Sequence, residues 1–222
     1  MNLKAAMLGI AAVLLANPSG FAAMTPRRAS ASQNSQAEGA AAYNAGASDL
    51  KRADALQAQA VQETDVRKRD KVLARAQSAY LSARGRFLEA TRATPGAPEP
   101  WNALGYAQRK LGDFDAALSA YDQALTLRPG FPEALEYRGE AYLALNRVAD
   151  VKQVYLDLFA SNRTLAAQLM QAIRTWIDLR RSSGGPPDGA TIEEMDHWAQ
   201  ERAQIAAQTA SLTRAGAAAS WR

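Results

Sequence analysis

The pattern of large and small hydrophobic residues in the middle of the chain repeats with a period of 34 positions. Shifting the sequence by that step places Trp101 on Leu135, Gly105 on Gly139, Leu111 on Leu145, Tyr121 on Tyr155 and Ala124 on Leu158. A period between about 20 and 50 residues is typical of stacked units that each bury one face against the next. The pattern therefore predicts a repeat array. This architecture is typical of binding scaffolds, but it does not indicate which partner is bound.

Each unit reads as two helices. In the first, hydrophobic residues recur at helical spacing around the small Gly105, which leaves a notch where a second helix can approach closely. Gly112, and Asn146 in the next unit, then predict the end of the first helix, because both residue types readily adopt the left-handed conformation. The second helix carries Phe114 and Tyr121 on its apolar face and stops before Pro129.

These residues resemble the tetratricopeptide repeat family, whose signature also runs over 34 positions. In the unit 98–131, seven of the eight signature positions hold the expected type: Trp101, Leu104, Gly105, Ala117, Tyr121, Ala124 and Pro129. Gln108 departs, and the unit 132–165 departs at Arg138 and Arg163. The resemblance implies an all-α superhelix of helical hairpins, a solenoid, whose first helices line a concave groove for peptides or proteins. It implies no catalytic activity.

The ends of the repeat domain, which we place at residues 41–181, leave the 34-residue register. The stretch from about residue 41 to Pro95 predicts two long helices joined near Thr64, an enlarged N-terminal hairpin of the kind that an array needs at its end. Residues 24–40 are rich in Ser, Gln and Ala and predict a disordered leader. Residues 214–222 are expected to form a disordered tail.

A final helix is predicted beyond a flexible linker. The linker, residues 182–190, is rich in Ser, Gly and Pro. Thr191 and Glu194 then have the spacing of a capping box and predict a helix over 191–213. We expect it to cap the exposed face of the helix 165–181. An apolar helix on a flexible tether can also pair with a second copy, which leaves homo-oligomerisation open.

The first residues have the pattern of a secretory signal peptide. Lys4 precedes an unbroken apolar run over 5–16, and Pro18 ends that run before small residues at Ala22 and Ala23. The run is far shorter than the ~20 residues that span a bilayer, so we expect cleavage of residues 1–23 and no stable membrane anchor afterwards. The prediction is a bacterial periplasmic protein, with secretion beyond the cell as the alternative.

Catalytic and metal chemistry has little support in this composition. The chain has no cysteine and one histidine, His197, which leaves no thiolate and no histidine pair for a metal site. It has no Gly-x-Ser-x-Gly elbow and no Gly-rich phosphate loop. The formal charge is only +4, and the basic residues alternate with acidic ones. We therefore predict no cofactor, no enzymatic activity and no nucleic-acid partner.

The resemblance implies which side chains face the groove. The second, fifth, ninth, twelfth and thirteenth positions of the two units give the candidates Asn102, Tyr106, Arg109, Lys110, Glu133, Glu136 and Glu140, beside Glu99, Leu143 and Ala144. Helical spacing alone places the three glutamates at 133, 136 and 140 on one stripe. Two interpretations stay open. The stripe holds a basic stretch of a partner, or it consists of ordinary solvated charges beside Arg109 and Arg138, each pair worth ~0–1 kcal/mol.

The sequence thus predicts a non-enzymatic periplasmic scaffold that binds another protein or peptide in its concave groove, in the assembly of the cell envelope. The alternative is a structural protein whose C-terminal helix mediates self-association. Truncation at Gly185 separates the two: loss of a capping helix leaves a destabilised monomer, and loss of a swapped helix changes the mass of the oligomer.

Overall fold

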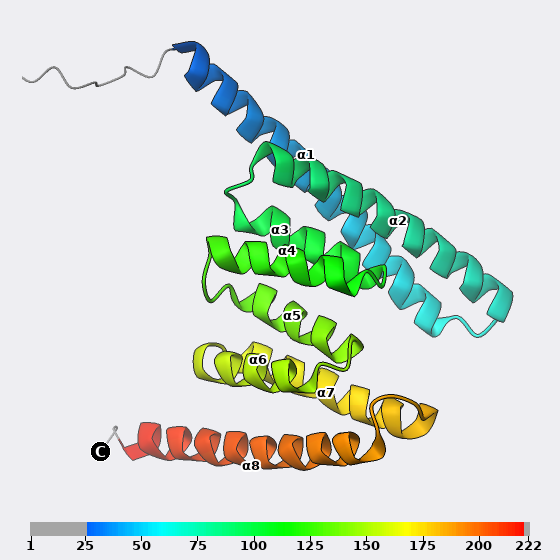
Figure 1. The fold of residues 1–222 in the computed structure, drawn as a ribbon, viewed down its shortest axis with the longest axis vertical. Helices are drawn as coiled ribbons and strands as arrows, with labels where there is room; N and C mark the ends of the chain where they lie inside the picture. The colour runs from blue at the N-terminus through cyan, green and yellow to red at the C-terminus, as the bar shows by residue number, and fades with distance from the viewer. Residues whose placement is uncertain (1–25, 220–222) are drawn as a thin grey trace, which may run out of the picture.

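The structure, a computed structural model, describes residues 26–219, and over this range the chain forms eight helices and no strand. They are α1 (Pro26–Gln62), α2 (Val66–Ala93), α3 (Pro98–Lys110), α4 (Phe114–Leu127), α5 (Pro132–Ala144), α6 (Val148–Ser161), α7 (Arg163–Ser183) and α8 (Gly189–Ala219). Successive helices form hairpins that stack from α1 to α8 (Figure 1). The predicted all-α helical-hairpin solenoid is confirmed.

Helix starts and ends follow local residue chemistry. The first helices of the two central hairpins begin on Pro98 and Pro132, where the missing N–H costs no intrahelical bond. After each of them, Gly112 at φ 86° and Asn146 at φ 57° turn the chain into the second helix. The left-handed conformation predicted for these two positions is therefore confirmed, and it sets the tight antiparallel geometry of both hairpins.

Close packing within and between the hairpins depends on the repeated glycines. A Cβ at Gly105 would lie 2.5 Å from Cε1 of Tyr121, whose side chain is fully buried. A Cβ at Gly139 would lie 2.9 Å from both δ carbons of Leu169. The notch predicted at Gly105 is therefore real: it admits the ring of the second helix, and the next glycine admits the first helix of the following hairpin.

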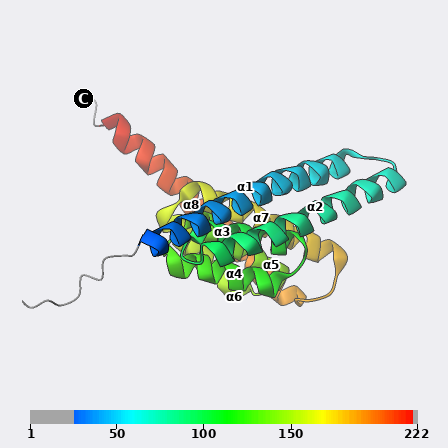
Figure 2. The ribbon, with the colours of Figure 1, turned by 90° about the horizontal axis from the view of Figure 1, so that it is seen from above.

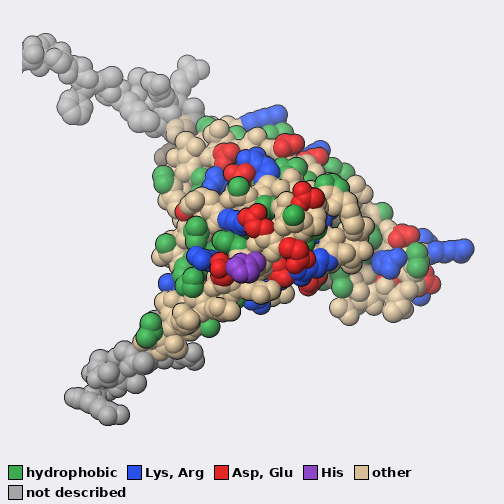
Figure 3. All heavy atoms as spheres, turned by 60° about the horizontal axis from the view of Figure 1, so that its bottom comes forward, with side chains coloured by type: hydrophobic (Ala, Val, Ile, Leu, Met, Phe, Trp, Pro, Cys, Tyr) green, Lys and Arg blue, Asp and Glu red, His purple; other side chains and the backbone are tan. Residues whose placement is uncertain are grey.

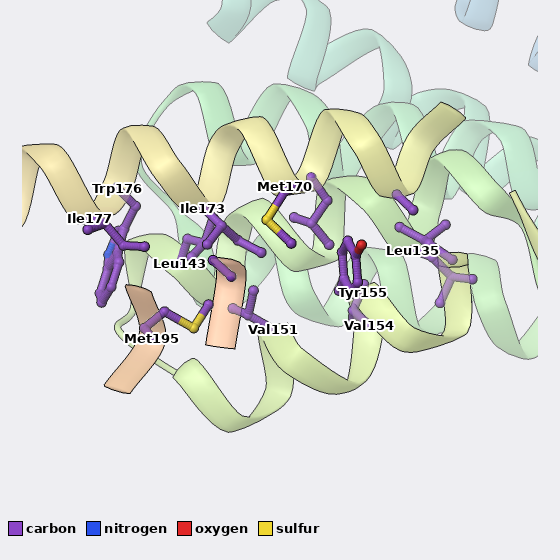
Figure 4. Packing of buried hydrophobic residues seen from close by; sticks show 14 of the residues in the cluster. Leu135, Leu143, Val151, Val154, Tyr155, Met170, Ile173, Trp176, Ile177 and Met195 are labelled. Carbon is purple, nitrogen blue, oxygen red and sulfur yellow. The ribbon is translucent and has the colours of Figure 1, made fainter. Parts of the chain in front are cut away.

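The largest apolar cluster joins α5, α6, α7 and the beginning of α8. Figure 4 shows Met195 of α8 meeting the cluster near Val151 and Ile173. Met195 is fully buried, and Ile192 and Ala199 are 5% and 1% exposed. The first part of α8 thus covers the apolar faces of α6 and α7 of its own chain.

The remainder of α8 extends away from this cluster. No residue from 200 to 212 is buried, and Leu212 is 72% exposed. Figure 2 shows this end of α8 projecting to one side of the stack while the tip of the α1–α2 hairpin projects to the other.

The structure differs from the expected leader at the N-terminal end. α1 begins at Pro26, so a helix occupies residues 26–40, which were expected to be disordered. The reason lies in the pairing of α1 with α2, which extends back to Gly39: a Cβ there would lie 2.6 Å from Cγ2 of Thr94. The segment before Gly39 then continues the helix, because residues 27–38 contain no glycine or proline that would end it.

The C-terminal bounds also differ from the expected ones. α7 continues to Ser183, the connector shortens to residues 184–188, and α8 runs on to Ala219, through much of the segment expected to be a tail. The predicted signal peptide, residues 1–23, lies outside the described residues. Among the helices of residues 26–219, none is long and apolar enough to cross a membrane.

Candidate functional site

The first helices of three successive hairpins, α3, α5 and α7, surround an open hollow of about 720 Å³. Contacts run from α3 to α5 and from α5 to α7, so the three helices lie side by side (Figure 1). The hollow is lined by Tyr106, Arg109 and Lys110 of α3, by Glu136, Tyr137, Glu140 and Leu143 of α5, and by side chains between 168 and 179 of α7. We call it the groove. None of its lining residues belongs to the second helices α4 and α6.

Two tyrosine rings and one arginine join α3 to α5 in the groove. The rings of Tyr106 and Tyr137 meet edge to face with their centroids 5.0 Å apart. The guanidinium carbon of Arg109 lies 5.1 Å and 5.3 Å from these two centroids. Arg109 also forms an ion pair with Glu140, and the two side chains are only 15% and 28% exposed. Their charges are therefore largely satisfied by each other.

Glu136 is in a different position from the other acidic residues of the groove. It is 5% exposed, and among the described residues no cation or hydrogen-bond donor lies within bonding distance of its carboxylate. Burial, and next the negative charge of Glu140, raise the pKa of Glu136 from 4.5 to about 7, while Arg109 acts in the opposite direction. The groove thus contains a buried carboxyl group whose charge changes near neutral pH.

Lys110 lies where the groove meets the N-terminal hairpin. Its ammonium nitrogen is 5.6 Å from the ring centroid of Tyr80 and 6.0 Å from that of Tyr106. Burial, and next the charge of Arg109, lower the pKa of Lys110. The hydroxyl groups of Tyr80 and Tyr106 both donate to Asp54, at 2.6 Å and 3.2 Å. This network ties α1 and α2 to the edge of the groove.

The groove brings together five of the seven candidate residues: Tyr106, Arg109, Lys110, Glu136 and Glu140. Asn102 and Glu133 do not line it. Glu133 is exposed, and the Oδ1 atom of Asn102 is buried without a hydrogen-bond partner among the described residues. The three glutamates are therefore not one uniform stripe: Glu133 is solvated, Glu136 is buried and Glu140 is paired with Arg109.

The repeat positions do not predict several residues that line or support the groove. Tyr137 lies beside a candidate position but not on one, and Trp176 comes from α7, where the 34-residue register had ended. Asp54 belongs to the enlarged first hairpin, to which no repeat position could be assigned. The apolar periodicity of α7 was visible in the sequence, and it could have placed a third wall on the groove.

A second open hollow, between α6, α7 and α8, is lined mainly by apolar side chains, and among the described residues neither it nor the groove holds a metal-ligand cluster. Within residues 26–219, no three His, Cys, Asp or Glu side chains are grouped as metal ligands would be. His197 is 75% exposed on α8, with Nδ1 3.8 Å from a carboxylate oxygen of Glu201. Figure 3, in which the end of the stack with α8 comes forward, shows acidic and basic side chains interspersed on the surface.

Comparison with known proteins identifies the segment that forms the α3 and α5 walls. Residues 102–150 match the tetratricopeptide repeat family. The match runs from α3 into α6, which is less than a quarter of the 222 residues. Within the matched segment, the pair of Arg109 and Glu140 connects α3 to α5 at the groove.

Among solved structures, the chain is similar to the first TPR of Spaghetti (RPAP3), which was solved bound to the HSP90 peptide SRMEEVD. The identity is 21%, the similarity covers 56% of this chain and 95% of that chain, and the TM-score is 0.40. No curated protein matches the chain.

Proposed function

We propose that this protein is a non-enzymatic scaffold that binds an extended segment of another protein, or a peptide, in the groove. The observation that supports this best is an open hollow of about 720 Å³ in which Tyr106, Tyr137, Leu143 and Trp176 lie among charged and amide side chains. Aromatic side chains of this kind supply much of the binding energy in protein interfaces. The hollow also opens on helices of the tetratricopeptide repeat segment.

A bulky substitution in the groove tests this proposal. Thr175 is an exposed groove residue whose hydroxyl donates to the carbonyl of Gln171, so Thr175→Trp fills the hollow without a change of charge. Thr126 is the matched control, because it is exposed on α4, outside the groove, and makes the same bond to the carbonyl of Asp122.

The assay is selection of phage-displayed random dodecapeptides on the immobilised protein, followed by fluorescence anisotropy of the enriched peptides. We expect Thr175→Trp to weaken their binding by about tenfold or more, since a filled groove loses contacts worth over 1.4 kcal/mol, and Thr126→Trp to leave it unchanged. Absence of enrichment, or equal binding by both variants, would overturn the proposal.

We further propose that residues 1–23 export the protein to the bacterial periplasm, where the scaffold acts in envelope assembly. The support is the sequence pattern alone: one basic residue, a short apolar run and small residues before the cleavage site. Fusion of residues 1–40, and of residues 24–40 as a control, to mature alkaline phosphatase tests the export step. Activity outside the cytoplasm with the first fusion only supports it, and equal activity of the two contradicts it.

Self-association through α8 is a second candidate function, favoured by a specific hollow. About 770 Å³ of open space lies between α6, α7 and the projecting part of α8, lined by Tyr155, Phe159 and Met170 among others. A second copy of α8 is the occupant that we propose for it. Light scattering of the full chain and of a chain ending at Arg202 tests this. The proposal is supported if the full chain is a dimer and the shortened chain is a monomer. It is excluded if the full chain is monomeric at 100 μM, about the concentration range in which weak dimers form.

A further inference from the structure

One charged group of the groove has no partner within the described residues. Arg109 and Glu140 form an ion pair, and the ammonium of Lys110 lies over the rings of Tyr80 and Tyr106. Glu136 is 95% buried, yet no donor or cation among the described residues bonds to its carboxylate. A buried carboxylate without such a partner is costly, so a ligand that supplies one gains the most free energy at this position.

The surroundings of Glu136 also favour a cation over other ligands. The side chains that α7 contributes to the groove are uncharged, from Gln168 to Leu179, so this wall offers no competing counterion. Beside Glu136, the ring of Tyr137 stands edge to face with that of Tyr106. Arg109 lies over both rings and Lys110 over that of Tyr106, so the rings are compatible with cationic side chains beside them, and the carboxylate is the group that still has no cation paired to it.

We propose that the groove takes a lysine or arginine side chain of the partner segment and pairs it with the Glu136 carboxylate, beside the tyrosine rings and against the uncharged wall of α7. The inference rests on the proposed function, because it specifies what the groove recognises. An acidic side chain at Lys110 is the weaker alternative, since the Lys110 ammonium already has two ring faces and the nearby Asp54.

Pairing of this kind is coupled to pH. The titratable and charged groups that face Glu136 are Glu140 and Tyr137 on its own helix, and Tyr106, Arg109 and Lys110 on α3. Glu140 disfavours the ionised form and Arg109 favours it, while the α7 wall adds no charge. A bound cation favours the ionised form, so binding releases a proton where Glu136 is protonated, and affinity rises from pH 5.5 to pH 8.

The test compares arginine with its neutral isostere. The probes are N-acetylated, C-amidated hexapeptide pools in which one position is fixed as arginine, citrulline or glutamate and the others are random. Retention on the immobilised full chain is measured at pH 5.5 and pH 8 for the wild type, Glu136→Gln and Glu133→Gln. Glu133→Gln is the matched control, because it removes the same charge from an exposed position on the same helix.

For the wild type and Glu133→Gln, we expect the ratio of retained arginine pool to retained citrulline pool to be about ten at pH 8. A ratio of that size corresponds to the free energy of a charge-assisted hydrogen bond to a buried group. The ratio should fall toward one at pH 5.5, and it should be near one at both pH values for Glu136→Gln. A preference that survives in Glu136→Gln, or that favours the glutamate pools, overturns the inference.

The proposed function and this inference fail in different ways. If the wild type retains arginine and citrulline pools equally and Thr175→Trp retains neither, the proposed peptide-binding groove stands and the role of Glu136 is refuted. If no pool is retained by the wild type, both are overturned.

Discussion

Replacement of Glu136 by glutamine should stabilise the fold, and only at neutral and alkaline pH. The pKa of Glu136 is about 7 in the folded chain and 4.5 for an ordinary glutamate. The folded state therefore binds the proton more tightly than the unfolded state does. As pH rises from about 4.5 to about 7, the wild type loses free energy of unfolding, and above pH 7 the loss is complete.

The size of the effect follows from the two pKa values. A difference of about 2.5 at about 1.4 kcal/mol per pKa unit gives a loss of about 3 kcal/mol at pH 8. Because Glu136 is only 5% exposed, little of this is screened by solvent. Glutamine has nearly the same shape and stays neutral, so Glu136→Gln should be more stable than the wild type by up to about 3 kcal/mol at pH 8 and by under about 0.5 kcal/mol at pH 4.

The measurement is urea unfolding of the wild type, Glu136→Gln and Glu133→Gln, followed by circular dichroism at pH 4, 6 and 8. Stacked repeats can unfold in more than one step, so the difference is taken from transitions of matched shape. Glu133→Gln should follow the wild type at each pH. A difference between Glu136→Gln and the wild type that stays constant from pH 4 to pH 8 would refute the assignment of Glu136 as a desolvated acid.

Three further substitutions test the packing, each by urea unfolding at pH 7. Gly105→Ala should destabilise by about 1–2 kcal/mol, because its Cβ meets the buried Tyr121 ring, whereas the same change at the open Gly85 of α2 should stabilise by about 0.5–1 kcal/mol; equal signs would contradict the notch. Met195→Ala should cost about 2–4 kcal/mol if α8 caps its own chain, and an effect below about 0.5 kcal/mol would argue against that cap. Glu140→Gln should cost about 1–3 kcal/mol by leaving the shielded guanidinium of α3 unpaired, and an unchanged midpoint would show that the pair is solvated.

The fold was predictable at positions where the residue type is compatible with only one local structure. Gly105 and Tyr121 are a small and a large residue at facing positions of a hairpin, and the next repeated glycine, Gly139, admits Leu169 of α7 in the same way. Gly112 and Asn146 similarly mark turns by their backbone conformation. The start of α1 was not predictable in this way, since an alanine- and serine-rich segment suits a solvated helix and a disordered chain about equally.

Five of the seven candidate residues could be placed at the groove from the sequence, but their electrostatic state could not. Repeat positions placed Glu133, Glu136 and Glu140 on one side of α5, and that much depends on helical spacing alone. Whether each carboxylate is solvated, buried or paired depends on how deeply α5 lies between α3 and α7 and on which side chain of α3 reaches it. Those distances arise from tertiary packing over more than 60 residues, and no local pattern encodes them.

Several polar groups at the groove make contacts that hold the array together, and Glu136 is not one of them. The hydroxyl of Tyr106 bonds to Asp54 and so attaches α3 to the N-terminal hairpin, while Arg109 and Glu140 attach α3 to α5. A ligand that competed for these groups would weaken contacts between units and lose the free energy that they contribute. A ligand that pairs with Glu136 displaces no internal partner among the described residues, so it binds without breaking a contact that stabilises the fold.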